Sequence, residues 1–217
     1  MDTTLTRNDQ HQYHRAGMRL MGFSESLECA GLVYTSFFTD EAAERGRVVH
    51  KICELFFKND LDEKSIDPQL KGYFDAVLAF AETHCTGTGT YYAVEQMLSH
   101  PVYRYATTPD LIGKFWTGTT QAGADANGHI DLYVDFKSGV PAWWHALQGA
   151  QGCEAWNKQT MQKNVVQGFA TCYLHADGTF KLSEITLVGT QQYNAAYRDF
   201  LNALAVTQLK FKHGLHK

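Results

Sequence analysis

The first third of the chain spaces its apolar residues as an amphipathic α-helix does. Thr39 and Asp40 are typical of a helix N-terminus and predict a helix that runs to about residue 59. Its expected inner side carries Val48, Val49, Ile52, Leu55 and Phe56. Asp67 and Pro68 predict the start of a second helix, whose apolar positions are Leu70, Tyr73, Phe74, Val77, Leu78 and Phe80.

In the middle third the apolar residues move towards every second position. Short strands are expected over residues 91–98, 102–107 and 110–116. The stretch 129–137 alternates throughout, so Ile130, Leu132, Val134 and Phe136 are expected to point one way and Asp131, Tyr133, Asp135 and Lys137 the other.

The last third predicts a helix over about 142–156, two strands over 166–175 and 179–187, and a helix over about 191–206. Ala176-Asp177-Gly178 between the two strands is a hairpin turn signal. This order predicts an α/β fold with a central mixed β-sheet flanked by helices. We expect a single domain over residues 1–217, with a helical N-terminal elaboration over 1–45 and a core over about 46–206.

Composition places the chain among soluble globular proteins. It has 217 residues, of which 44% are hydrophobic and 19% charged. No apolar run approaches the roughly 18 to 20 residues that cross a membrane. The polar N-terminal residues carry no secretory signal, so the expected compartment is the cytoplasm, that of the host if the chain is phage-encoded. The five scattered cysteines form no C-x-x-C pair, so we expect reduced thiols and neither disulfides, structural zinc nor an iron–sulfur cluster.

The net charge of −4 argues at first against a nucleic-acid partner, but the charges are unevenly distributed. Residues 1–136 hold 11 Lys and Arg against 19 Asp and Glu, whereas residues 137–217 hold 8 against 4. Such a division suits a site in which carboxylates hold cations and a basic surface holds phosphates, although folding can mix the two parts.

The feature that points to chemistry is Asp110 followed by Asp135 and Lys137. Alternation places Asp135 and Lys137 on one face of the same strand, roughly 7 Å apart along it. Carboxylates with an adjacent amine can hold Mg²⁺, which prefers oxygen ligands, and place a charged nitrogen beside a reacting water. Taken alone, such a triplet is usually a solvated strand face.

Other polar residues accompany this group. His50 and Glu54 share a face of the first long helix, Glu95 lies in a strand-like stretch, and His145, Gln148 and Gln151 share a face of the helix that follows Lys137. Each by itself is more often structural or solvent-facing than functional.

The order of these residues resembles the RecB-type and phage-exonuclease branch of the PD-(D/E)XK nuclease superfamily. The matching stretches are G-R-V-V-H at 46–50, V-E at 94–95, T-P-D-L-I-G at 108–113, I-D-L-Y-V-D-F-K-S-G at 130–139 and A-L-Q-G-A-Q at 146–151. No single stretch is specific, but five in this order are. The resemblance implies a restriction-endonuclease-like core and a Mg²⁺-dependent DNA nuclease, more often an exonuclease than an endonuclease, with Mn²⁺ able to substitute.

The resemblance also implies roles for individual residues. His50, Asp110 and Asp135 would be the metal ligands, with the Phe136 backbone carbonyl as a further oxygen. Glu95 would lie at the edge of the site. Lys137 would be the catalytic lysine, and Gln148 would position Lys137 or the DNA backbone.

Candidate contacts to DNA are less defined by the pattern. Gln148, Gln151, Lys158, Arg104, Lys114 and Lys163 are candidates for contacts to the DNA backbone. Trp143 and Trp144 are candidates for stacking on an unpaired base, with at least one of them expected in the core. By analogy with the family, a single-strand annealing protein or a helicase is the expected partner, in DNA recombination or repair.

Two departures from the family pattern keep alternatives open. Gly152 stands where the family has tyrosine, and Thr107 stands where it has glycine. The missing tyrosine and the negative net charge favour a nuclease-like module that binds DNA ends or a protein without cutting. A third hypothesis is a different metalloenzyme, or a structural protein in which these acids are surface charge.

Overall fold

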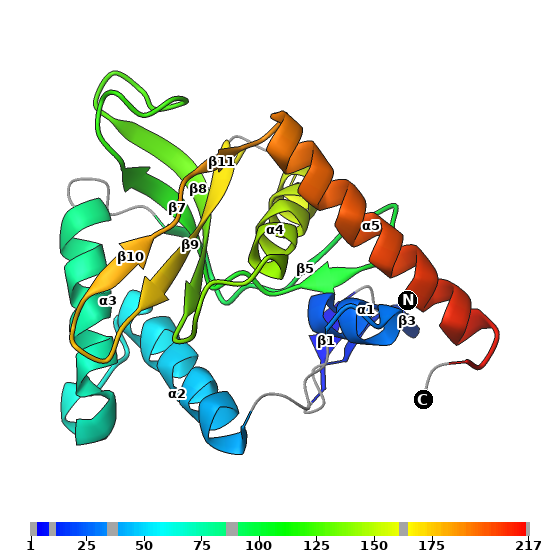
Figure 1. Ribbon diagram of the computed structural model, residues 1–217, viewed down its shortest axis with the longest axis horizontal. Helices are drawn as coiled ribbons and strands as arrows, with labels where there is room; N and C mark the ends of the chain where they lie inside the picture. The colour runs from blue at the N-terminus through cyan, green and yellow to red at the C-terminus, as the bar shows by residue number, and fades with distance from the viewer. Residues whose placement is uncertain (1–3, 9–11, 34–38, 86–90, 161–164, 216–217) are drawn as a thin grey trace.

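The computed structural model describes residues 4–8, 12–33, 39–85, 91–160 and 165–215 (Figure 1). The strands are β1 (Leu5–Arg7), β2 (Tyr13–Arg15), β3 (Met18–Leu20), β4 (Tyr91–Val94), β5 (Leu98–Ser99), β6 (Ala106–Thr107), β7 (Leu111–Trp116), β8 (His129–Lys137), β9 (Gly168–Leu174), β10 (Phe180–Leu182) and β11 (Thr186–Leu187). The helices are α1 (Phe23–Ala30), α2 (Asp40–Phe57), α3 (Lys71–His84), α4 (Trp144–Thr160) and α5 (Gln191–Lys212), with 3-10 turns η2 (Glu63–Ser65) and η3 (Pro68–Leu70). None of the helices in these ranges is long and apolar enough to cross a membrane.

A mixed sheet forms the centre of the molecule, as the sequence predicted. Its strand order is β10-β9-β8-β7-β4, with β11 beside β9. β8 and β9 are parallel, and the other neighbours are antiparallel. Helices α2 and α3 cover one face of the sheet and α4 covers the other, with α5 packed outside α4 (Figure 1).

The predicted alternation of β8 is confirmed by its two packing partners. Ile130, Leu132, Val134 and Phe136 pack with the apolar residues of α2 and α3. Tyr133 faces the other way and packs against α4. Asp135 and Lys137 share the face of Tyr133, so the strand holds them on the α4 side of the sheet.

Helix α4 is the crossover that parallel pairing of β8 and β9 requires. It lies very close to the sheet, because glycines face the strands. A Cβ at Gly149 would come 2.3 Å from the ring of Phe169 on β9. The close approach brings side chains of α4 to the end of β8.

The predicted helix starts and the hairpin turn are also confirmed, although the strand expected over 179–187 is divided into β10 and β11. The Thr39 side chain accepts a hydrogen bond from the Ala42 amide at 3.1 Å and caps α2. Asp67 caps η3, directly before α3. At the turn between β9 and β10, Gly178 has a φ of 85° and the amide of His175 donates to the Thr179 carbonyl at 2.9 Å.

The prediction of a helical N-terminal part was incomplete, because β1, β2 and β3 form an antiparallel sheet before α1. Strands of three residues are too short to show a period of two. The turn between β2 and β3 uses Ala16 and Gly17, both with positive φ, in place of the Asn-Gly or Asp-Gly pair that signals such a turn. The chain then joins the body where the Ala106 amide donates to the Met21 carbonyl at 2.9 Å.

The strands expected over 91–98 and 102–107 are shorter and divided. β4 ends at Val94, because Glu95 adopts a left-handed backbone with a φ of 49°. β5 and β6 then pair with each other away from the central sheet.

Candidate active site

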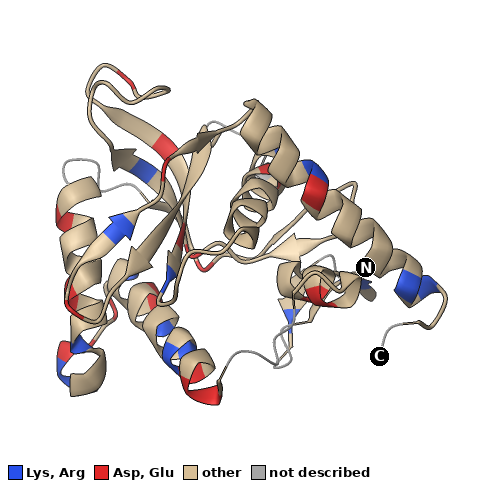
Figure 2. Ribbon diagram, in the orientation of Figure 1, with Lys and Arg blue, Asp and Glu red and all other residues tan. Residues whose placement is uncertain are grey.

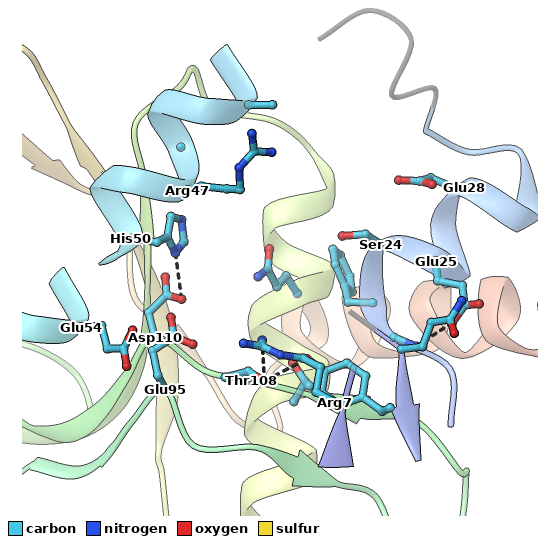
Figure 3. A pocket seen from close by; sticks show the side chains of 18 of the residues that line it. Arg7, Ser24, Glu25, Glu28, Arg47, His50, Glu54, Glu95, Thr108 and Asp110 are labelled. Carbon is cyan, nitrogen blue, oxygen red and sulfur yellow. Dashed lines mark hydrogen bonds and ion pairs between the residues drawn. The ribbon is translucent and has the colours of Figure 1, made fainter. Parts of the chain in front are cut away.

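A cleft of about 1170 Å³ runs between the central sheet with α2 on one side and the N-terminal sheet with α1 on the other. Its lining includes His50 and Lys51 of α2, Glu95 and Asp110 at the sheet, and Arg7 of β1. Figure 3 shows His50, Asp110 and Arg7 projecting from opposite sides into the same space. The cleft therefore brings the N-terminal elaboration next to the acidic residues that the sequence singled out.

Three side chains meet on the sheet side of this cleft. His50, Glu95 and Asp110 each offer an atom that could bind a metal ion, and these atoms all lie within 4.8 Å of one another. Antiparallel pairing of Val94 with Leu111 places Glu95 beside Asp110, and the Glu95 amide donates to the Asp110 carbonyl at 3.2 Å. Helix α2 adds His50, whose Nδ1 lies 3.1 Å from Asp110 Oδ1 (Figure 3).

Asp110 is held on both sides. Its second oxygen, Oδ2, accepts a hydrogen bond from the Phe136 amide of β8 at 2.7 Å, and only 8% of the residue is exposed. The carboxylate thus bridges from the start of β7 to β8 and fixes the group at the end of the sheet. The observed contact uses the amide of Phe136, and its carbonyl as a metal ligand stays a prediction.

Asp135 and Lys137 form an ion pair next to this group. Gln148 extends from α4, which covers the same face of the sheet as Asp135, and its Nε2 donates to Asp135 Oδ1 at 2.7 Å. Asp135 is 2% exposed and the Lys137 side chain 20%, so the carboxylate is buried while the lysine keeps partial access to solvent. The cluster of three therefore contains Glu95, which the resemblance placed at the edge of the site. Asp135, which the resemblance made a metal ligand, lies next to the cluster and contacts Lys137 and Gln148.

Burial makes negative charge costly here. It raises the pKa of Glu95 to about 7, and the charge of Asp110 adds to this rise. Burial also raises the pKa of Asp135 to about 6, although Lys137 opposes the rise. Burial opposes the ionisation of Asp110 as well, yet His50 and Lys137 hold its pKa below the ordinary value. A positive ion would therefore relieve unfavourable charge at this point.

The donor set fits a divalent cation. Two carboxylates and one imidazole offer the oxygen and nitrogen ligands that Mg²⁺, Mn²⁺ and similar ions take in proteins. The Asp110 charge raises the pKa of His50, so a proton and a metal ion compete for that imidazole.

Of the residues expected to contact DNA, Gln148 lines the cleft, whereas Gln151, Lys158, Arg104 and Lys114 lie away from it. Gln151 is fully buried, and its Nε2 donates to Thr107 Oγ1 at 2.8 Å, so it supports the strand end beneath the cleft. Lys114 lies 3.5 Å from Asp125 in an ion pair, Lys158 lies near His100, and Arg104 is exposed in a turn with a φ of 57°. These four residues do not line the cleft. Lys163 is outside the described residues.

The two tryptophans behave differently. Trp144 is partly buried and packs against the core beneath α4, as expected for at least one of them. Trp143 is 54% exposed in front of the helix. It does not line the cleft, so base stacking by Trp143 stays a prediction.

The cleft instead takes its positive charge from Arg7, Arg19, Arg47 and Lys51. Arg47 lies within the stretch that resembles the family, but Arg7 and Arg19 belong to the N-terminal sheet. Nothing in the sequence pattern marks them, because only the folded position of that sheet brings them to the cleft. Figure 2 shows Lys and Arg interleaved with Asp and Glu along α2, so this helix presents both signs of charge.

Comparisons with known proteins add evidence on the fold. No family model matches the chain, and no curated protein matches it by sequence. A crystal structure of a protein from Eubacterium rectale, named "Putative exonuclease", superposes with a TM-score of 0.53 at 11% identity. The match covers 91% of this chain and 83% of that chain. At such low identity the similarity shows a shared α/β fold.

Proposed function

We propose that this protein is a divalent-metal-dependent deoxyribonuclease that hydrolyses phosphodiester bonds. The observation that carries the proposal is the meeting of His50, Glu95 and Asp110 beside the Asp135–Lys137 ion pair, at one end of the sheet and open to a cleft. A lone acidic cluster is common on protein surfaces. A partly buried cluster beside a paired lysine on a rigid strand is suited to phosphodiester hydrolysis, because it can hold a cation and stabilise developing negative charge.

His50, Glu95 and Asp110 would hold the cation, which supplies a Lewis acid for the phosphate and lowers the pKa of a water. Asp135 raises the pKa of Lys137 against the effect of burial, so this lysine stays protonated at neutral pH. Lys137 is therefore suited to donate hydrogen bonds and to stabilise the charge that develops on the phosphate. Gln148 fixes the Asp135 carboxylate and, through it, the position of the ammonium group.

The finer parts of the proposal rest on resemblance. The sequence order of the site residues and the fold shared with a protein named as an exonuclease both support DNA as substrate and exonuclease action. We propose Mg²⁺ as the cation, a 5′-phosphate and a 3′-hydroxyl as products, and a role in DNA processing or recombination.

The test uses end-labelled linear DNA and closed circular DNA, each with Mg²⁺, Mn²⁺ or EDTA. We expect shortening of linear DNA that requires metal and is abolished by Asp110→Asn and by Lys137→Gln. Asp199→Asn, an exposed change on α5, is the matched control and should cleave as the unmodified protein does. Cleavage that persists in EDTA or in Asp110→Asn would overturn the proposal. Binding of DNA without metal-dependent shortening would support the alternative of an inactive binding module.

A further inference from the structure

Two residues of the N-terminal sheet converge on the segment that carries Asp110. Arg7 of β1 and Tyr13 of β2 are direct cross-strand partners. Arg7 Nη1 donates to Thr108 Oγ1 at 3.4 Å, and the Tyr13 hydroxyl shares a hydrogen bond with the same oxygen at 2.9 Å. Thr108 lies two residues before Asp110, so these contacts tie the N-terminal sheet to the acidic group.

Arg7 differs from the other cations of the cleft in its pairing. Arg19 is paired with Glu25, Arg47 with Glu44, and Lys51 with Glu54. Among the described residues, no carboxylate lies within ion-pair distance of Arg7. Its hydrogen bond to Thr108 is long, and a guanidinium has five N–H groups to donate, so most of its capacity is unused.

The guanidinium of Arg7 also lies within electrostatic range of the acidic group. Burial raises the pKa of Glu95, and the positive charge of Arg7 acts against that rise. Figure 3 shows Arg7 reaching across the cleft from the side opposite His50. An anion bound between the two sides would therefore meet Arg7 on one side and the acidic group, with its cation, on the other.

We propose that Arg7 binds the two non-bridging oxygens of a DNA backbone phosphate at this site, from the wall of the cleft opposite α2. This inference rests on the proposed function, because it takes DNA as the substrate. The planar fork of arginine suits two oxygens of one phosphate, and Thr108 and Tyr13 keep the side chain at the mouth of the acidic group. The N-terminal sheet would then be part of the DNA-binding surface.

The experiment measures binding of a fluorescent DNA oligonucleotide in EDTA at several salt concentrations, so that it does not depend on cleavage. Removing one phosphate contact lowers the slope of log Kd against log salt by about 1. We expect that change for Arg7→Gln, whereas Arg7→Lys keeps the slope. The control, Arg198→Gln on the exposed side of α5, removes the same charge away from the cleft and should leave the slope unchanged.

Cleavage in Mg²⁺ gives the second readout. The rate at low DNA concentration should fall about 10- to 100-fold in Arg7→Gln, and Arg7→Lys should recover only part of it. An unchanged slope in Arg7→Gln would overturn the inference even if the protein cleaves DNA. A reduced slope in a protein that never cleaves DNA would support the inference and refute the nuclease. No binding of DNA by the unmodified protein would overturn both.

Discussion

The ring of Tyr133 fills the space beside Gly152, where a Cβ would lie 2.2 Å from Tyr133 Cε2. Gly152 is the position at which the family pattern has tyrosine. Here the aromatic ring between sheet and helix comes from β8, and α4 has no side chain in its way. The packing of Tyr133 therefore leaves no room for a side chain at position 152, and Gln148 still donates its hydrogen bond to Asp135.

Gly152→Ala should destabilise the protein, since the methyl group must displace a fully buried ring. Overpacking of this kind costs about 1 to 3 kcal/mol, which urea unfolding would measure. Gly139→Ala is the matched control, because a Cβ there meets nothing within 4 Å. Equal stability of the two variants would show that α4 can move away from the sheet without cost.

Gln148→Ala should lower the rate of DNA cleavage about 10- to 100-fold, as loss of a residue that orients an active-site carboxylate does. The change removes the donor at 2.7 Å from Asp135 Oδ1, so the carboxylate and Lys137 lose a fixed orientation. Initial rates on end-labelled DNA would measure the effect, with the exposed Gln192→Ala as control. An unchanged rate would mean that the ion pair with Lys137 orients Asp135 without help.

The stabilisation that Mn²⁺ gives should increase with pH. Glu95 and Asp135 have folded-state pKa values near 7 and 6, above their ordinary values of 4.5 and 3.8. In the metal-free protein these two groups bind protons more tightly when folded than when unfolded, which stabilises the fold at low pH. This stabilisation is lost as the pH rises through 6 and 7. A bound cation would offset the charge of the ionised carboxylates and restore the lost stability. The rise in Tm with Mn²⁺ should therefore be larger at about pH 8 than at about pH 5.5. Glu95→Gln should reduce this pH dependence; an unchanged dependence would exclude Glu95 from the site.

Glu95 destabilises the metal-free fold in two ways, because its carboxylate resists ionisation and its backbone is strained. A non-glycine residue with a φ of 49° costs of order 1 kcal/mol or more. Glu95→Gly should therefore raise the free energy of unfolding in EDTA at neutral pH while removing the response of Tm to Mn²⁺. Asn59→Gly, at an exposed residue with a φ of 56°, separates relief of backbone strain from loss of the partly buried Glu95 carboxylate. Destabilisation by Glu95→Gly would show that its side chain supports the fold.

The sequence predicted best where one physical signal acted alone. Nine alternating residues of β8 fixed which side chains face α2 and α3, and a polar cap fixed the start of α2. The N-terminal sheet escaped prediction because its stability comes from pairing between short strands and from contact with Tyr105 and Ala106, which are distant in sequence.

The site was predictable in its members more than in its arrangement. Alternation placed Asp135 and Lys137 on one face, and the structure confirms it. That Glu95 joins His50 and Asp110 depends on the left-handed turn after β4 and on the register between β4 and β7. Arg7 reaches the cleft only through tertiary folding, so no local pattern could indicate it.

The left-handed backbone at Glu95 also has a consequence for the evolution of related sequences. A side chain that strains the main chain and resists ionisation persists only while its chemistry is selected. A lineage released from that selection would drift first at position 95, towards glycine or asparagine, and its descendants would fold better than the parent. The residue at this position is therefore a marker of whether a related chain retains the proposed metal site.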